Sequence, residues 1–284
     1  MQNKKVIVAK NAGFCFGVKR AVDMVDDLLK EGREIYVIGE LVHNNQVIET
    51  LTKKGLKTVE NLDDIPNDGT MVIRSHGASI KIINEARSKG IEIIDATCPF
   101  VNKARIVAND FYKKDYNILI CGDKNHAEIV GINSLTENSA KIVNDINQIK
   151  DINFEKSIVG VMSQTTYKLT FLKEVVLALL DRGLKKIVIE NTICLDSTTK
   201  QTEIKDLAKK VDVMIVVGGK SSSNTNKLAE ISLASGAQTY HIEIADELKK
   251  DWFVGANKIG VAAGASTAQF LIDAVVSGIE KMVE

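Results

Sequence analysis

The feature that most restricts the fold of this chain is an internal repeat aligned on three of its cysteines. Each of these cysteines has a polar residue 28 positions downstream, and an apolar, strand-like run that ends in glycine lies just before that residue. The pairs are Cys15 with His43, Cys98 with His126, and Cys194 with Ser222. Such a period is typical of a chain assembled from repeated supersecondary units.

A second strand-like run in each repeat also ends in a polar residue. The runs are MVIRSH, VGVMSQT and IGVAAGAS, which end at His76, Thr165 and Ser266. After the first two, a helix-like stretch and a further strand lead to the next cysteine, whereas only a helix follows the third. The run KKVIVAKNAGFC before Cys15 has the form of the missing strand. We therefore expect the beginning of the chain to complete the third unit.

The alternation of strands with helices of about 10 to 15 residues predicts parallel sheets. We expect an α/β fold, a three-lobed trefoil of pseudo-threefold related units around a central cavity, each with a small parallel sheet flanked by helices. The expected units are residues 16–98, 99–194 and 195–284, the last completed by residues 1–15. Such sheets bind ligands at the carboxyl ends of their strands. We therefore hypothesise that the three cysteines converge on the central cavity.

Composition excludes several classes of partner. The chain has 37 basic and 37 acidic side chains, so no overall field attracts nucleic acid or an anionic membrane. The longest apolar run, Val175 to Leu180, is far too short to span a bilayer. The N-terminus lacks the pattern of a secretory signal, and we expect a cytoplasmic protein with a small-molecule partner. Thiols stay reduced there, which favours metal binding, catalysis or burial for the four cysteines.

Three cysteines lie between a strand-like run and a helix-like stretch, where helix N-terminal amides favour a thiolate. A lone cysteine is usually a small buried hydrophobe, and Cys121, inside NILICG and without a counterpart, fits that description. Cys15, Cys98 and Cys194 lie in register and indicate one shared metal. Zinc sites usually contain a close pair such as C-x-x-C, which is missing here. Three thiolates on a cubane iron-sulfur cluster would leave one iron open.

The remaining polar positions divide into two kinds. His43 and His76, with the serine-rich loops SSSNTN and GAAGAS, predict a diphosphate site, because loop N–H groups, hydroxyls and a helix N-terminus suit an anion. From these loops we select Ser222, Ser223, Asn224 and Ser266 as candidate ligands. Two residues beyond the 28-residue positions only the second unit has a carboxylate, Glu128, which is otherwise a helix-capping acid. We expect Glu128 to be a proton source, with His126 and Thr165 nearby, and His241 to be an ordinary satisfied residue.

In order and spacing, several segments together resemble the LytB/IspH family of hydroxymethylbutenyl diphosphate reductases, along essentially the whole chain. The segments are GFCFGVKRA, GELVHN, RSHG, DATCPFV, HAE, SQTT, NTICLDSTTKQ, VGGKSSSNTN and AGAS. One departure is Ala268, two residues after Ser266, where the family has proline.

The resemblance implies a reductive dehydroxylation of (E)-4-hydroxy-3-methylbut-2-enyl diphosphate to isopentenyl and dimethylallyl diphosphate, the last step of the methylerythritol phosphate route to isoprenoids. It implies a 4Fe-4S cluster held by Cys15, Cys98 and Cys194 with one open iron, and a donor such as ferredoxin or flavodoxin. Glu128 matches the family's proton donor, with His126 and Thr165 beside it. The diphosphate-binding groups match His43, His76, Ser222, Ser223, Asn224 and Ser266.

Two other functions remain open from the residues alone. A zinc-dependent phosphate-ester hydrolase that uses the histidines and Glu128 would be colourless. A non-enzymatic sensor that binds a cluster or a phosphorylated ligand would be coloured but would not turn over substrate.

Overall fold

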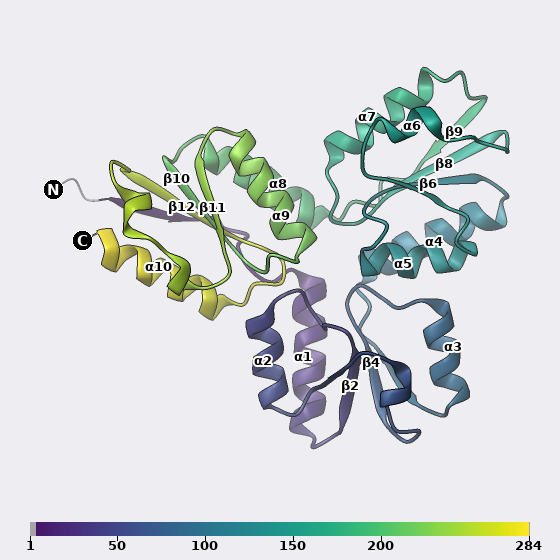
Figure 1. Cartoon of the computed structure of the whole chain (residues 1–284), viewed down its shortest axis with the longest axis horizontal. Coiled ribbons are helices and arrows are strands. Elements are labelled where there is room, and N and C mark those ends of the chain that lie inside the picture. Colours follow the sequence, from purple (N-terminus) through teal and green to yellow (C-terminus); the bar gives the residue numbers. More distant parts are fainter. Residues whose placement is uncertain (1–3, 284) are drawn as a thin grey trace. The chain divides into compact units, whose positions relative to one another are not determined.

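The structure, a computed structural model that describes residues 4–283, contains three four-stranded sheets in which every strand is parallel to its neighbours (Figure 1). The sheets share one strand order, in which the strand before a cysteine lies at an edge. Their orders are β5-β4-β2-β3, β9-β8-β6-β7 and β1-β12-β10-β11. The predicted α/β class, with three small parallel sheets flanked by helices, is confirmed.

The elements follow one another as the repeat predicts. The strands are β1 (Lys5–Val8), β2 (Ile35–Ile38), β3 (Lys57–Val59), β4 (Thr70–Ile73), β5 (Glu92–Asp95), β6 (Asn117–Cys121), β7 (Lys141–Val143), β8 (Ile158–Ser163), β9 (Lys186–Ile189), β10 (Val213–Val217), β11 (Gln238–Ile242) and β12 (Lys258–Ala263). The α-helices are α1 (Phe16–Lys30), α2 (Asn45–Lys53), α3 (Ile80–Ser88), α4 (Pro99–Lys113), α5 (Ala127–Asn133), α6 (Gln148–Asp151), α7 (Leu169–Leu180), α8 (Leu195–Ala208), α9 (Ser223–Ala234) and α10 (Gln269–Val283). Short 3-10 turns are Leu62–Asp64, Ser134–Thr136, Ala245–Glu247 and Lys250–Phe253.

The described chain divides into two compact units. Unit 1 holds the chain up to Lys19, Val42–Thr50 and the chain from Leu195 onward, and it contains the sheet of β1, β10, β11 and β12. Unit 2 holds Arg20–Leu41 and Leu51–Cys194, with the other two sheets. In unit 1, β1 pairs with β12, as expected for the strand before Cys15. The unit boundaries expected at Cys98 and Cys194 stay a prediction.

The central strands are largely apolar, as expected for strands of a sheet that helices cover on both faces. In unit 1 every residue of β10 is buried, and its side chains alternate between two cores. Val213, Ile215 and Val217 pack with side chains of α10, whereas Met214 and Val216 pack with side chains of α8 and α9 on the other face (Figure 1). Continuous apolar runs of this kind are typical of parallel strands buried on both sides.

The sheet around β6 in unit 2 is built in the same way. Leu119 and Cys121 face the core formed with α7, while Ile118 and Ile120 face the core formed with α4 and α5. Cys121 has no exposed surface, and burial raises the pKa of its thiol to about 12. The expectation that Cys121 is a core residue is confirmed. Among the described helices, none combines the length and the apolar character that crossing a membrane requires.

Close packing in unit 2 requires a glycine in β8. A Cβ atom at Gly160 would lie 2.5 Å from the nearest atom of the Phe111 ring, and Phe111 is itself buried on α4. We predict that Gly160→Ala lowers the free energy of unfolding by about 1–3 kcal/mol, because an overpacked core displaces its neighbours. Urea unfolding measures the loss.

The double variant Gly160→Ala/Phe111→Leu provides the control for this prediction. It should lose less stability than the sum of the two single losses, because the smaller side chain makes room for the new methyl group. Simple additivity would show that the ring does not restrict position 160.

Candidate active site

The three cysteines of the repeat occupy equivalent places in the fold. Each lies a few residues after an edge strand and immediately before a helix, namely before α1, α4 and α8. All three are partly buried and carry no disulfide. At the start of α1, Cys15 Sγ accepts a hydrogen bond from the backbone N–H of Val18 at 3.4 Å. The thiol therefore lies beside the N–H groups of the first helical turn. The expected position between strand and helix is therefore correct for each cysteine.

A backbone hydrogen bond ties each cysteine to the loop after the neighbouring inner strand. The cysteine N–H donates to a carbonyl oxygen at the carboxyl end of β12, β4 or β8. The three bonds are Cys15 to Ala265 (3.0 Å), Cys98 to Ser75 (2.9 Å) and Cys194 to Thr165 (2.8 Å). Parallel strands carry their polar loops at one edge of a sheet, and these bonds attach the cysteines to those loops.

The same loops correct one equivalence expected from the sequence, that of Thr165 with His76 and Ser266. Each loop closes with a turn whose N–H donor lies two residues after the residue bonded to the cysteine. The turns run from Gly77 to Arg74, from Tyr167 to Gln164, and from Thr267 to Gly264. Thr166 is therefore the counterpart of His76 and Ser266, and Thr165 is the counterpart of Ser75 and Ala265. Two adjacent threonines in SQTT conceal this one-residue difference.

The electrostatics of Cys98 modify the expectation that a helix start favours a thiolate. Burial is the largest influence and raises the pKa of the Cys98 thiol, while the N–H groups of Phe100 and Val101 lower it. The charge of Glu128 raises this pKa further and that of Arg20 lowers it. The net pKa is raised. The helix amides act as expected, but desolvation outweighs them.

The polar residues 28 positions after the cysteines lie at helix starts. His126 caps α5, with its Nδ1 accepting the N–H of Glu128 at 3.2 Å, and Ser222 caps α9, with its Oγ accepting the N–H of Thr225 at 3.3 Å. In the first repeat the corresponding bond is made by Asn44, whose Oδ1 accepts the N–H of Val47 at 3.0 Å. His43 therefore lies one residue before the cap. Asn44 is not among the residues expected from the sequence, although asparagine before a helix is a common capping signal.

Glu128 is a buried ionisable group of unit 2. Its side chain is 1% exposed and makes two hydrogen bonds to one residue. Oε1 accepts the backbone N–H of Thr165 and Oε2 accepts its hydroxyl, each at 2.7 Å. Burial raises the pKa of Glu128 to about 7, against the lowering effect of the two Thr165 bonds. The carboxyl group is therefore half protonated near neutral pH.

Unit 2 brings several of the predicted site residues together. Thr165 contacts Glu128 through its N–H and hydroxyl, and it accepts the N–H of Cys194 through its carbonyl oxygen. His126 is bonded to the backbone of Glu128, which places the proton of a neutral ring on Nε2. The rings of His76 and His126 meet edge to face, with centroids 5.5 Å apart. A carboxyl, a hydroxyl and two imidazoles thus lie beyond the carboxyl ends of strands from two neighbouring repeats.

Unit 1 contains five of the six residues predicted to bind a diphosphate, all except His76. Ser266 Oγ donates to the carbonyl oxygen of His43 at 3.0 Å, and a Cβ at Gly219 would lie 2.5 Å from that same oxygen. The glycine therefore lets the segment of His43 approach the loop before α9. Asn224 is 5% exposed, and its amide nitrogen and oxygen have no hydrogen-bond partner among residues 4–283. Buried amides of this kind are usually satisfied by a bound polar group.

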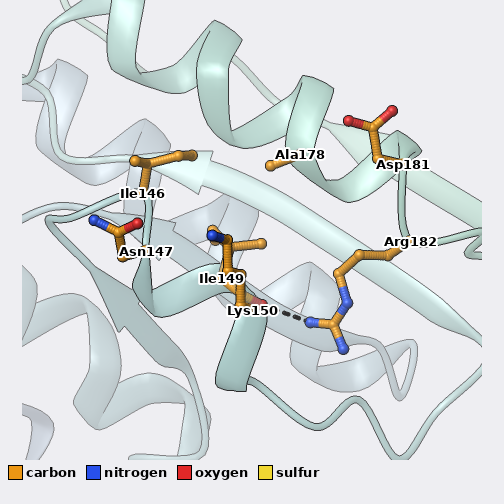
Figure 2. A pocket seen from close by; sticks show the side chains of 7 residues that line it. All are labelled: Ile146, Asn147, Ile149, Lys150, Ala178, Asp181 and Arg182. Atoms are coloured by element: carbon orange, nitrogen blue, oxygen red, sulfur yellow. Dashed lines mark hydrogen bonds between the residues drawn. The ribbon is translucent and has the colours of Figure 1, made fainter.

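A hollow elsewhere in unit 2 contains none of these residues. Arg182 lines it but is occupied structurally, because its Nη1 donates to the carbonyl oxygens of Ile149 (2.6 Å) and Ile152 (2.8 Å). The hollow lies at the C-terminal end of α7 (Figure 2), whereas Thr165 precedes the start of that helix. The lining residues are Ile146, Asn147, Ile149, Lys150, Ala178, Asp181 and Arg182. This hollow is therefore separate from the candidate site.

Comparison with known protein families shows to which family the chain belongs. A family model described as LytB protein matches residues 6–280. The chain belongs to the LytB family. The family that the sequence motifs predict is thereby confirmed.

Relatives of this LytB protein match it along nearly their whole length. The 4-hydroxy-3-methylbut-2-enyl diphosphate reductase of Clostridioides difficile (strain 630) is 43% identical over 277 residues, which are 97% of this chain and 99% of the relative. The reductase of the same name from Caldanaerobacter subterraneus subsp. tengcongensis is 41% identical and covers 98% of this chain and 97% of the relative.

Two solved structures are similar throughout. The E-1-hydroxy-2-methyl-but-2-enyl-4-diphosphate reductase of Plasmodium falciparum superposes with a TM-score of 0.91 at 31% identity, covering 97% of this chain and 87% of that one. A structure of (E)-4-hydroxy-3-methyl-but-2-enyl diphosphate reductase, described as the terminal enzyme of the non-mevalonate pathway, gives a TM-score of 0.71 at 36% identity, with coverage of 98% and 99%.

The raised pKa of Glu128 leads to a test in the folded protein without added cofactor. The carboxyl binds a proton more tightly in the folded state, so its contribution to stability is full below pH 4.5 and is lost as the pH rises through about 7. Glu128→Gln removes this titration. We predict that the unfolding free energy of the variant minus that of the wild type increases by about 2 kcal/mol when the pH is raised from 5.5 to 8.

Urea unfolding at both pH values measures this difference. Glu49→Gln, at an exposed position of α2, serves as the control and should show the same pH dependence as the wild type. An equal response of Glu128→Gln and wild type would contradict a raised pKa.

Proposed function

We propose that this LytB protein is a 4-hydroxy-3-methylbut-2-enyl diphosphate reductase. It takes up two electrons and two protons, releases the substrate hydroxyl as water, and forms isopentenyl or dimethylallyl diphosphate. The observation that carries the proposal is the match to reductases of this name over almost the full length of both chains. We place the enzyme in the cytoplasm, with a one-electron donor such as ferredoxin or flavodoxin.

The cysteines fit an iron-sulfur cluster. Cys15, Cys98 and Cys194 share one position in the repeat, partly exposed and at a helix start, while the fourth cysteine is sealed in a core. Thiolate sulfur is the ligand that such clusters require. We infer that these three residues hold a 4Fe-4S cluster whose fourth iron lacks a protein ligand. When bound, the cluster supplies electrons and an open coordination position at the reacting end of the substrate.

The diphosphate end of the substrate is assigned to six polar residues, namely His43, His76, Ser222, Ser223, Asn224 and Ser266. The buried amide of Asn224 supports this assignment, because a phosphate oxygen accepts what its nitrogen donates. Ser223 and Asn224 also open α9, a helix of 12 residues whose N-terminus favours anions.

Proton transfer is assigned to Glu128, with Thr165 as relay and His126 beside them. With the pKa of Glu128 near 7, the acid form is available at neutral pH. A threonine hydroxyl both accepts and donates, so Thr165 Oγ1 can take a proton from Glu128 Oε2 and pass its own to the leaving hydroxyl. The backbone N–H of Thr165 holds Oε1 in place during the transfer. The second proton goes to the allylic carbon skeleton and follows the same path after Glu128 has taken up another proton from solvent.

Replacing the cysteines tests the cofactor assignment. We predict that Cys15→Ser, Cys98→Ser or Cys194→Ser, purified without oxygen, loses the brown colour, most of the iron and the reductase activity. Serine removes the thiolate ligand without changing the size of the side chain greatly. Absorption spectra with iron and sulfide assays measure the outcome.

Cys121→Ser is the matched control for the cysteine variants. It should keep the colour and the iron and lose only stability, because its hydroxyl is buried in an apolar core. A colourless wild type that contains zinc and releases inorganic phosphate would instead support a hydrolase. A coloured wild type without turnover would support a sensor.

The acid role of Glu128 is tested by kinetics. We predict that Glu128→Gln keeps its iron and lowers kcat by about 100-fold or more, the usual size of a general-acid contribution. Wild-type kcat should fall above about pH 7 as the carboxyl loses its proton. Turnover with a chemical reductant between pH 6 and pH 9 measures both effects.

Thr165 provides a matched pair of variants for the relay. Thr165→Ser keeps the hydroxyl and should retain most of the turnover, whereas Thr165→Val should resemble Glu128→Gln. Equal activity in the two threonine variants would remove Thr165 from the proton path.

A further inference from the structure

A buried lysine in unit 1 has no role in the function described so far. Lys200 lies on α8, six residues after Cys194, and is 5% exposed. Its Nζ donates to the carbonyl oxygens of Asn11 and Gly13, the latter at 3.0 Å, and lies 3.8 Å from a carboxylate oxygen of Asp196. Lysine is rarely buried unless its charge is paired and hydrogen-bonded. These hydrogen bonds and the nearby carboxylate therefore compensate for the burial of the lysine charge.

Glu203, one turn further along α8, binds the same loop with the opposite polarity. Its Oε1 accepts the backbone N–H of Lys10 at 2.5 Å. Its Oε2 accepts the backbone N–H of Asn11 at 3.0 Å and the side-chain amide of Asn11 at 2.8 Å. The lysine thus holds carbonyl oxygens of the loop and the glutamate holds its N–H groups.

The loop held in this way leads directly into Cys15. Residues 9–15 lie between β1 and α1 and take part in no strand pairing. Gly13 has φ +94°, and a Cβ there would come within 3.1 Å of Ile272 and 3.3 Å of the Thr267 carbonyl oxygen. Backbone hydrogen bonds hold the two ends of the loop, from Ala9 to Val261 and from Cys15 to Ala265. Between these ends, the loop is held by the two side chains of α8 and by close packing at Gly13.

Lys200 is also a departure from the repeat. The residues six positions after the other two cysteines are Ala21 and Ala104, both fully buried. At this position the fold prefers a small apolar side chain, and an ammonium group is costly there. Another cation serves a neighbouring cysteine loop, since Arg20 Nη1 donates to the carbonyl oxygen of Thr97 at 3.3 Å, one residue before Cys98.

We propose that Lys200, supported by Glu203, is a positioning residue that fixes the loop before Cys15 and so sets the place of the Cys15 thiol. That the thiol binds a cluster rests on the proposed function, but the clamp itself concerns the protein alone. It joins the helix that begins after Cys194 to the loop that ends at Cys15.

Thiol reactivity in the cluster-free full chain tests the clamp. Wild type, Lys200→Met and Lys200→Arg are treated with iodoacetamide, and the alkylation rate of each cysteine is followed by peptide mass spectrometry. Without the ammonium group the two loop carbonyls lose their donor, so Cys15 should react about fivefold faster or more in Lys200→Met. Cys98 and Cys194 should stay within about twofold of wild type, and Lys200→Arg should restore the Cys15 rate, because its guanidinium keeps the charge and the donors.

Two outcomes would overturn the proposal. A Cys15 rate in Lys200→Met within twofold of wild type would show that the loop does not depend on the lysine. Equal acceleration of all three cysteines would show a general loosening of the fold. If Lys200→Met does not fold, Glu203→Gln decides, since it removes only the charge of the second contact. It should accelerate Cys15 alone by about twofold to threefold, and an unchanged rate would count against the clamp.

Reconstituted protein separates this proposal from the proposed function. Lys200→Met should release iron to a chelator several times faster than wild type, and Lys200→Arg should release it at the wild-type rate. If wild type binds no iron while Cys15 still responds selectively to Lys200→Met, the proposed cofactor is wrong and the clamp stands.

Discussion

The backbone hydrogen bond from each cysteine to the loop after the neighbouring inner strand is the constraint on which the rest of the site depends. It exists because the edge strand and the inner strand run parallel and end at the same side of the sheet. In unit 2 this bond has a second effect. Thr165 accepts the Cys194 N–H with its carbonyl oxygen while its own N–H and hydroxyl hold Glu128. One residue therefore links a proposed cluster ligand to the proposed acid.

Much of the fold could be predicted because the repeat is defined by fixed distances along the sequence. The strand-like runs, the place of each cysteine between strand and helix, and the family itself all follow from residues that can be counted. The geometry of the turns could not be predicted from these distances. Whether Thr165 or Thr166 corresponds to His76 depends on which carbonyl closes the turn. Likewise, a capping asparagine after His43 shifts the start of α2 by one residue.

Electrostatic effects were harder still to predict from sequence, because they depend on burial. A helix start before Cys98 correctly indicates amides that stabilise a thiolate, but the surrounding atoms exclude water and raise the pKa of the thiol. Glu128 shows the same competition, in which two hydrogen bonds to the charged form are outweighed by desolvation. The role of Lys200 could not be predicted from the sequence, because its hydrogen-bond partners lie almost 190 residues away along the chain.

The division into three small sheets has a cost that a single large sheet would avoid. Every open sheet leaves two unpaired edges, which are templates for pairing with other chains. Here the edge strands are mostly three or four residues long, and charged side chains occupy them, including Lys5 on β1, Glu92 and Asp95 on β5, and Lys186 on β9. Short, charged edges resist association between copies. At one edge of each sheet, this protection lies in the strand that leads to a cysteine.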